Sequence, residues 1–463
     1  MRISKRDFIR LTAGAGAMAS MGQLSRSASV AQTTSGYRAM VGIFLFGGSD
    51  NWNMIVPTDS RYGAYAANRG ASLALPSSSL TPLPGVPYGL HPSLAPLSQA
   101  WADGALSAVL NVGSLYQPLT KALYQSTPGA APLNLMSHAD QQNQWQGLRM
   151  RDVNTDGFMG RQNDREVALA TPDLISLGGS TLAIIGESSS PLILPSTGGL
   201  TRNGFNPAAT DVPTTTRQAA LAAFATDNAD GATTQLTGQT IAAAYSQAVT
   251  ANTILTSSRS AVDQYFINPT TGAVLTSDIA HQLLRVARMI EARNSLGHSR
   301  QVFFASQGGF DNHSDQVDAT GTTTGIQAGL FGDLAMAMAG FYAAMKALGL
   351  QKNVTAFTMS DFGRTYRVNA QRGTDHAWGN NHLILGGAIT PKTIHGAYPD
   401  VTLGGSQDID SAALGRWIPT LALEEYIGSI AQWYGVAAGD LTYVFPNWVT
   451  WTTNGRGPVP FFS

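Results

Sequence analysis

Apolar and polar residues along this chain follow two patterns, short continuous apolar runs and longer helical repeats. The apolar runs predict buried strands at 41–46, 106–112, 301–305, 354–359 and 383–385. Helical spacing of apolar residues predicts helices at 278–296, 330–348 and 421–434. Helix and strand alternate most clearly after residue 277, which is typical of a parallel sheet covered on both faces. We therefore expect one large α/β domain with a mostly parallel central sheet.

Two segments fall outside this pattern. Residues 1–31 carry basic residues, then a weakly apolar stretch and small residues at 29–31, which is the order found in an export signal. The segment resembles a twin-arginine signal with Lys5 in place of the first arginine, and a disordered basic tail is the alternative. We expect export to the periplasm or beyond, a mature domain at 32–463, and a partly helical insertion at about 195–260 that lies over the sheet, as a loop or a lid.

Composition argues against a nucleic-acid partner and a membrane span, and it limits the ligands available to a metal site. Removal of residues 1–31 leaves 23 basic and 28 acidic residues, a net charge of −5, and no basic patch, so nucleic acid is not expected as a partner. No apolar run beyond the signal reaches the roughly 18 residues of a membrane-spanning helix. The chain has no cysteine, so disulfides do not stabilise it and a transition-metal site has to use imidazole and carboxylate ligands.

Polar residues that suit a metal follow several of the predicted strands. Asp50, Asp361 and the pair Asp311 and His313 stand just beyond strand ends, and His376 follows in a nearby loop. In a parallel sheet, ligands gather beyond the carboxyl ends of the strands. An Asp-x-His pair alone is more often structural, but the polar residues beyond the other strand ends favour a metal site.

Several short motifs make the chain resemble the DUF1501 family, an exported bacterial group placed in the alkaline phosphatase and sulfatase-like superfamily. The resemblance covers nearly all of the mature chain and implies a three-layer α/β/α fold of that type. The matching segments are 46–50, 90–94, 137–140, 157–161, 308–313, 360–365, 373–376 and 444–447.

The resemblance also implies a set of metal ligands. Asp50 resembles the first ligand of the superfamily, Asp311 with His313 the middle pair, Asp361 the carboxylate at a strand end, and His376 the late histidine. The implied cofactor is one or two divalent ions, Zn or else Ca or Mn. The chain departs from the superfamily in two ways. Its middle pair is spaced Asp-x-His, and Phe362 stands where a histidine ligand of the second metal is expected.

The resemblance places a nucleophile at the start of a helix, where Ser137 and His138 stand. Ser137 is either this nucleophile or the N-cap of a helix over 139–147, and the two interpretations carry equal weight. His138 is expected to act as an acid and base or as a further ligand. Arg364 is expected to bind a tetrahedral oxyanion, with a structural ion pair as the alternative.

These observations predict an exported, metal-dependent hydrolase or transferase acting on phosphate or sulfate esters of a small molecule or polymer. The alternative is a sulfatase-like protein without catalysis that binds or assembles partners in the cell envelope. Members of the resembled family are often encoded beside another exported family, which implies an exported partner protein. An oxidoreductase has little support because no dinucleotide or haem motif occurs.

Overall fold

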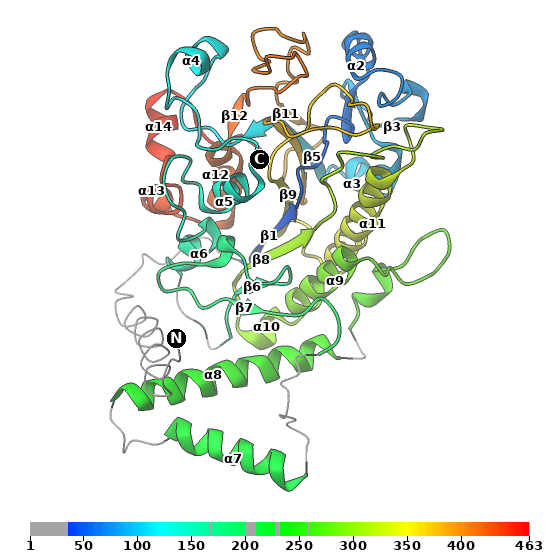
Figure 1. Cartoon of the computed structure of the whole chain (residues 1–463). Coiled ribbons are helices and arrows are strands. Elements are labelled where there is room, and N and C mark those ends of the chain that lie inside the picture. The colour runs from blue at the N-terminus through cyan, green and yellow to red at the C-terminus, as the bar shows by residue number, and fades with distance from the viewer. Residues whose placement is uncertain are drawn as a thin grey trace.

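The central element of the computed structural model is a nine-stranded sheet with helices on both faces (Figure 1). The structure describes residues 36–166, 169, 171–199, 210–226, 232–257 and 260–462. All strands of this sheet run parallel except β10, which is antiparallel to both of its neighbours. The order is β11 (Ile394–Gly396), β5 (Leu106–Gly113), β10 (Asn380–Leu385), β9 (Val354–Ser360), β1 (Arg38–Leu45), β8 (Arg300–Gln307), β6 (Leu174–Ser176) and β7 (Leu192–Ile193), and β12 (Leu421–Ala422) also pairs with β5.

Both faces of the sheet are buried, as the continuous apolar runs predict. Alternate residues of β1 point to opposite sides, so Val41 and Ile43 join one apolar core while Met40 and Phe44 join another. The first core contains η2 (Pro92–Leu97), α3 (Ser98–Ala102), α9 (Asp278–Glu291) and α11 (Ile326–Ala347). The second contains α5 (His138–Gly147), α6 (Phe158–Asn163), α12 (Leu423–Tyr434), α13 (Leu441–Val444) and the first residue of α14 (Trp448–Thr453). The predicted three-layer α/β/α fold with a mostly parallel sheet is confirmed.

The remaining described elements are a small second sheet and several short helices. A small antiparallel sheet has the order β2-β4-β3. Its strands and the other short elements are β2 (Ile55–Pro57), α2 (Tyr62–Arg69), η1 (Ser77–Ser79), β3 (Thr81–Pro82), β4 (Tyr88–Leu90), α4 (Lys121–Ser126), η3 (Leu182–Ile184), η4 (Asp263–Tyr265), α10 (Arg293–Leu296) and η5 (Ala438–Asp440).

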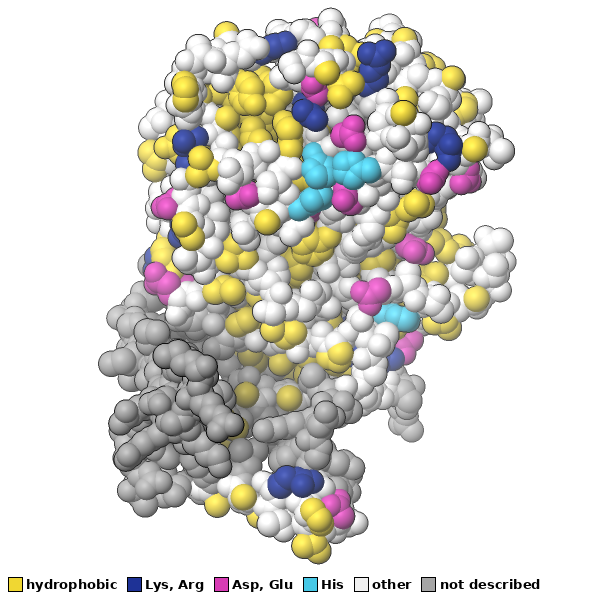
Figure 2. Space-filling model, viewed as in Figure 1, with side chains coloured by type: hydrophobic (Ala, Val, Ile, Leu, Met, Phe, Trp, Pro, Cys, Tyr) yellow, Lys and Arg dark blue, Asp and Glu magenta, His cyan; other side chains and the backbone are white. Residues whose placement is uncertain are grey.

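Most residues that the structure describes in the predicted insertion are helical. It contains α7 (Val212–Thr226) and α8 (Ala232–Leu255), which pack against each other below β6 and β7 in Figure 1. The histidines that gather on the surface lie at the other end of the molecule (Figure 2). The two described helices of the insertion therefore lie away from these histidines. The predicted export signal at 1–31 lies outside the described residues.

One helix bears on the prediction about membrane spans. In the part of the chain that the structure describes, α11 alone is long and apolar enough to cross a membrane. More than half of its most apolar stretch is buried inside the molecule, where it contacts α9 and η2. This burial is typical of a core helix.

Parallel pairing brings three strand ends to one edge of the sheet. Leu45 at the end of β1 pairs with Gln307 of β8 on one side and with Ser360 of β9 on the other. The segments that follow these three strands therefore leave the sheet side by side. Gly47 permits this crowding, because its φ is 111° and a Cβ there would clash with the backbone of Asp311.

Candidate metal centre

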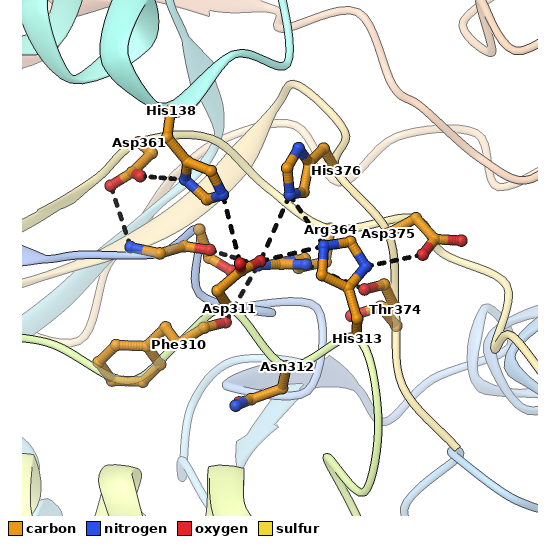
Figure 3. A network of polar contacts seen from close by, with 12 residues as sticks. His138, Phe310, Asp311, Asn312, His313, Asp361, Arg364, Thr374, Asp375 and His376 are labelled. Carbon is orange, nitrogen blue, oxygen red and sulfur yellow. Dashed lines mark hydrogen bonds and ion pairs between the residues drawn. The ribbon is translucent and has the colours of Figure 1, made fainter. Parts of the chain in front are cut away.

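Three histidines and one aspartate meet beyond this edge of the sheet (Figure 3). Asp311 and His313 lie in the loop after β8, and His376 lies between β9 and β10. His138 is the first residue of α5 and comes from the opposite side of the cluster. The group reaches solvent, since the side chains of Asp311 and His313 are 47% and 46% exposed.

The distances among the donor atoms suit a single metal ion. Asp311 Oδ1 lies 3.1 Å from His313 Nε2 and 3.3 Å from His376 Nε2, and Asp311 Oδ2 lies 3.5 Å from His138 Nε2. Ligands about 2.0–2.1 Å from a tetrahedral ion are separated by about 3.3 Å. The donors of His138, Asp311 and His376 all lie within 4.8 Å of one another, and this is the only such group in the described ranges.

Each of the three histidines is held by its other ring nitrogen. The Nδ1 atoms lie 2.7 Å from Asp361 Oδ2 for His138, 2.9 Å from Asp375 Oδ1 for His313, and 2.8 Å from the carbonyl of Met136 for His376. These partners are acceptors, so we assign the proton of each neutral ring to Nδ1, which leaves the Nε2 lone pair directed into the cluster. This is the usual arrangement around a metal-binding histidine.

A cation between the converging lone pairs would stabilise the cluster. His313 Nε2 and His376 Nε2 are 3.0 Å apart, and in the assigned tautomers both are acceptors. The carboxylate of Asp311 adds negative charge beside them. A metal ion or an extra proton between these atoms would remove the repulsion. The donor set of imidazole and carboxylate is one that Zn and similar divalent ions accept.

Neighbouring charges shift the ionisation of the cluster. Burial acts to raise the pKa of Asp311, but the hydrogen bond and charge of Arg364 outweigh it and lower the pKa below its usual value. The hydrogen bond that His138 donates to Asp361 raises the pKa of His138 despite some burial. Burial lowers the pKa of His376, against the hydrogen bond to Met136. Asp311 is therefore a carboxylate at neutral pH.

Asp361, predicted as a metal ligand, lies beside the cluster and contacts His138. Its side chain is fully buried at the end of β9, where Oδ2 contacts His138 and also accepts from Gln142 Nε2 at 2.8 Å. Its other oxygen accepts from the amide of Gly47 at 3.2 Å. With both oxygens bonded to donors of the protein, Asp361 fixes the ring of His138.

Asp50, also predicted as a ligand, lies outside the cluster. Its buried carboxylate forms an ion pair with Arg69 and accepts from Gln316 Nε2 at 2.7 Å. Arg69 is 0% exposed, so this carboxylate compensates a buried charge. The predicted position beyond β1 is correct, but the structure assigns the side chain to a different partner.

Ser137 and Arg364, predicted as catalytic residues, both form hydrogen bonds that are typical of structural residues. The Ser137 hydroxyl donates to Asp140 Oδ2 at 2.6 Å and accepts from the Asp140 amide, so Ser137 is the N-cap of α5. Arg364 is buried, and its guanidinium donates to the carbonyls of Gly48 and Thr374 and to Asp311. This ion pair was the alternative interpretation of Arg364. It holds Asp311 in place, and the guanidinium is fully buried.

Sequence reasoning missed several residues around the cluster. Gln142 and the carbonyl of Met136 could not be predicted from the sequence, because the role of an amide or a carbonyl depends on which group it contacts in the folded chain. Phe362, the departure from the resembled ligand set, lies 4.8 Å and 4.7 Å from the ring centres of His138 and His376. His382, which follows His376 by six residues, is buried in the core beside Trp145, and burial lowers its pKa to about 3.

Comparison with known proteins identifies one family. The model of the family described as "Protein of unknown function (DUF1501)" matches residues 87–409, which is more than half of the chain. No curated protein matches the sequence.

Solved structures show weak likenesses over most of the chain. Ps i-CgsB in complex with k-i-k-neocarrahexaose has 9% identity and a TM-score of 0.36, over 92% of this chain and 78% of that one. PsFucS1 sulfatase from Pseudoalteromonas sp. has 10% identity and a TM-score of 0.34, over 94% and 73%. Phosphonate monoester hydrolase SpPMH from Silicibacter pomeroyi has 10% identity and a TM-score of 0.30, over 82% and 76%. At these TM-scores we take no functional argument from them.

Proposed function

The chain belongs to the DUF1501 family, and we propose that it is an exported hydrolase that binds one divalent metal ion through His138, Asp311 and His376. The observation that carries this proposal is the convergence of histidine Nε2 atoms on one carboxylate, with every Nδ1 held by an acceptor. Export is proposed from the pattern of residues 1–31, and the phosphate or sulfate ester substrate from the resemblance described above.

In the proposed reaction, the metal ion and His313 would have different tasks. A divalent ion, when bound, would polarise an ester oxygen and lower the pKa of a water molecule. His313 lies beside the ligands, is half exposed and is oriented by Asp375, so its Nε2 can take or give a proton there. Exposure of Asp311 and His313 leaves this side of the cluster open to a substrate.

The first test is the metal content of the purified protein. We expect about one equivalent of Zn or a similar ion in the wild type, and its loss in Asp311→Ala and His376→Ala. His281→Ala, which changes a histidine lining a separate pocket on α9, is the matched control and should keep the metal. Turnover of an aryl phosphate and an aryl sulfate by the loaded protein then distinguishes the ester. Equal metal content in all four proteins, or none in any, would contradict the proposal.

A second candidate function has its own observation. The hydroxyl of Ser137, the expected nucleophile, donates to Asp140, which favours a function without a serine nucleophile. His313 Nε2 also lies close enough to His376 and Asp311 to serve as a fourth ligand. A closed four-ligand site is typical of structural zinc. The chain would then be a metal-stabilised binding or assembly protein of the cell envelope.

A further inference from the structure

Gln142 contacts the same carboxylate oxygen that orients His138. Asp361 Oδ2 lies 2.7 Å from His138 Nδ1 and 2.8 Å from Gln142 Nε2. The Gly47 amide binds the other oxygen at 3.2 Å. The carboxylate is thus fixed at both oxygens, and the Gln142 amide determines where Oδ2 can meet the histidine.

Gln141 holds the acceptor that orients His376. Its side chain is fully buried, its Nε2 donates to Ser114 Oγ at 3.0 Å, and its Oε1 accepts from the Met136 amide. Met136 has a φ of 68°, a left-handed conformation that a residue with a side chain adopts only where its surroundings enforce it. In that conformation its carbonyl lies 2.8 Å from His376 Nδ1.

The geometry of α5 explains why both glutamines reach the site. His138, Gln141 and Gln142 are separated by three and four residues, so they lie on one face of the helix. The N-cap Ser137 fixes where this face begins. One short helix therefore supplies a ligand together with the supports of two ligands.

We infer that Gln141 and Gln142 are positioning residues of the metal centre, which set its metal affinity by fixing His376 through Met136 and His138 through Asp361. This inference rests on the proposed metal site. Partners of this kind typically change metal affinity 10- to 100-fold.

The test compares Zn²⁺ affinity among variants of the full-length protein, by competition with a chromophoric chelator. We expect Gln141→Leu and Gln142→Leu to weaken binding by about 10- to 100-fold. The visible spectrum of bound Co²⁺ should also change in both, since the ligand geometry changes. Gln141→Glu keeps an oxygen for the Met136 amide, and Ser114 can donate its hydroxyl hydrogen to the new carboxylate. Its affinity should stay closer to wild type than that of Gln141→Leu.

Gln146→Leu is the matched control. Gln146 is another buried glutamine of α5, but it accepts from Thr181 and Ala183, away from the cluster. It should lose stability and keep wild-type Zn²⁺ affinity. Half-buried Gln142 keeps the test informative if Gln141→Leu does not fold. A wild type without Zn²⁺ affinity would overturn the proposed metal site. Two other outcomes would overturn the positioning role alone, provided that the wild type binds Zn²⁺. One is a Zn²⁺ affinity of Gln142→Leu equal to that of the wild type. The other is a Zn²⁺ affinity of Gln146→Leu that is weakened as much as that of Gln142→Leu.

Discussion

At the scale of single residues, His313 distinguishes the two candidate functions of the proposed metal site. Its Nε2 lies 3.0 Å from His376 Nε2 and 3.1 Å from Asp311 Oδ1, which suits a fourth ligand. The compact group, however, is His138, Asp311 and His376, and His313 flanks it on the side away from His138 (Figure 3). A half-exposed imidazole held by a carboxylate suits proton transfer. In the proposed hydrolase, we expect His313 to have that role.

Replacement of His313 by Gln should separate the two roles. We expect His313→Gln to keep about one metal per chain and to lower ester turnover by about 10²- to 10⁴-fold, the usual contribution of a general acid or base. Metal content and kcat would be measured on the same preparation, with His281→Gln as the control. Loss of the metal would make His313 a ligand and favour the structural site of a binding protein.

The positions of the site residues were predictable from sequence, but their partners were not. Asp311, His313 and His376 were found because Asp and His stand together in glycine-rich segments of a chain with eight histidines. Asp50 was placed correctly beyond β1, yet Arg69 of α2 binds its carboxylate. A sequence shows that a carboxylate lies at a strand end. It does not show which charged side chain forms an ion pair with that carboxylate in the folded chain.

At the scale of elements, apolar patterns predicted the strands of the site and its main helices. The strands predicted at 41–46, 301–305 and 354–359 are β1, β8 and β9, and the helix predicted at 421–434 is α12. The antiparallel direction of β10 was not predicted, because the direction of a strand depends on the path of the loop before it. That loop carries His376, so the reversal of the chain also shapes the site.

Helix α12 carries a buried acid that should make stability depend on pH. Glu424 is 0% exposed, and burial raises its pKa to about 8 although contacts with Trp451 and the backbone act to lower it. Between its ordinary pKa and this raised value, the folded chain binds a proton that the unfolded chain releases. Stability from this group is thus present at low pH and is lost as the pH rises toward 8.

Glu424→Gln should remove this loss. The variant should match the wild type near pH 4.5 and exceed its free energy of unfolding by on the order of 4 kcal/mol above pH 8. Urea unfolding between pH 4.5 and 8.5 measures the difference. Glu187→Gln changes an exposed carboxylate and should leave the pH dependence as in the wild type. Parallel pH profiles of wild type and Glu424→Gln would show that this carboxyl is solvated.

At the scale of the whole molecule, the site joins three distant parts of the chain. His138 begins α5, Asp311 follows β8, and His376 precedes β10. Close approach of these parts depends on glycines, since a Cβ at Gly373 would clash with the backbone of His313. The sheet, more than any local motif, therefore determines whether the ligands meet, and an unfolded chain cannot present them together.

Metal binding should consequently stabilise the folded chain as a whole. A ligand that binds only the folded state adds RT ln(1 + [L]/Kd), or about 2.7 kcal/mol at a hundredfold excess over Kd. We expect chelator-treated wild type to gain a few degrees in Tm when Zn²⁺ is added, a shift of about that size for a large domain. Asp311→Ala should lose the gain and His281→Ala should keep it. Calorimetry of the three proteins would measure this. An equal gain in Asp311→Ala would place the stabilising metal elsewhere, because Asp311 is the one residue whose oxygens reach every histidine of the cluster.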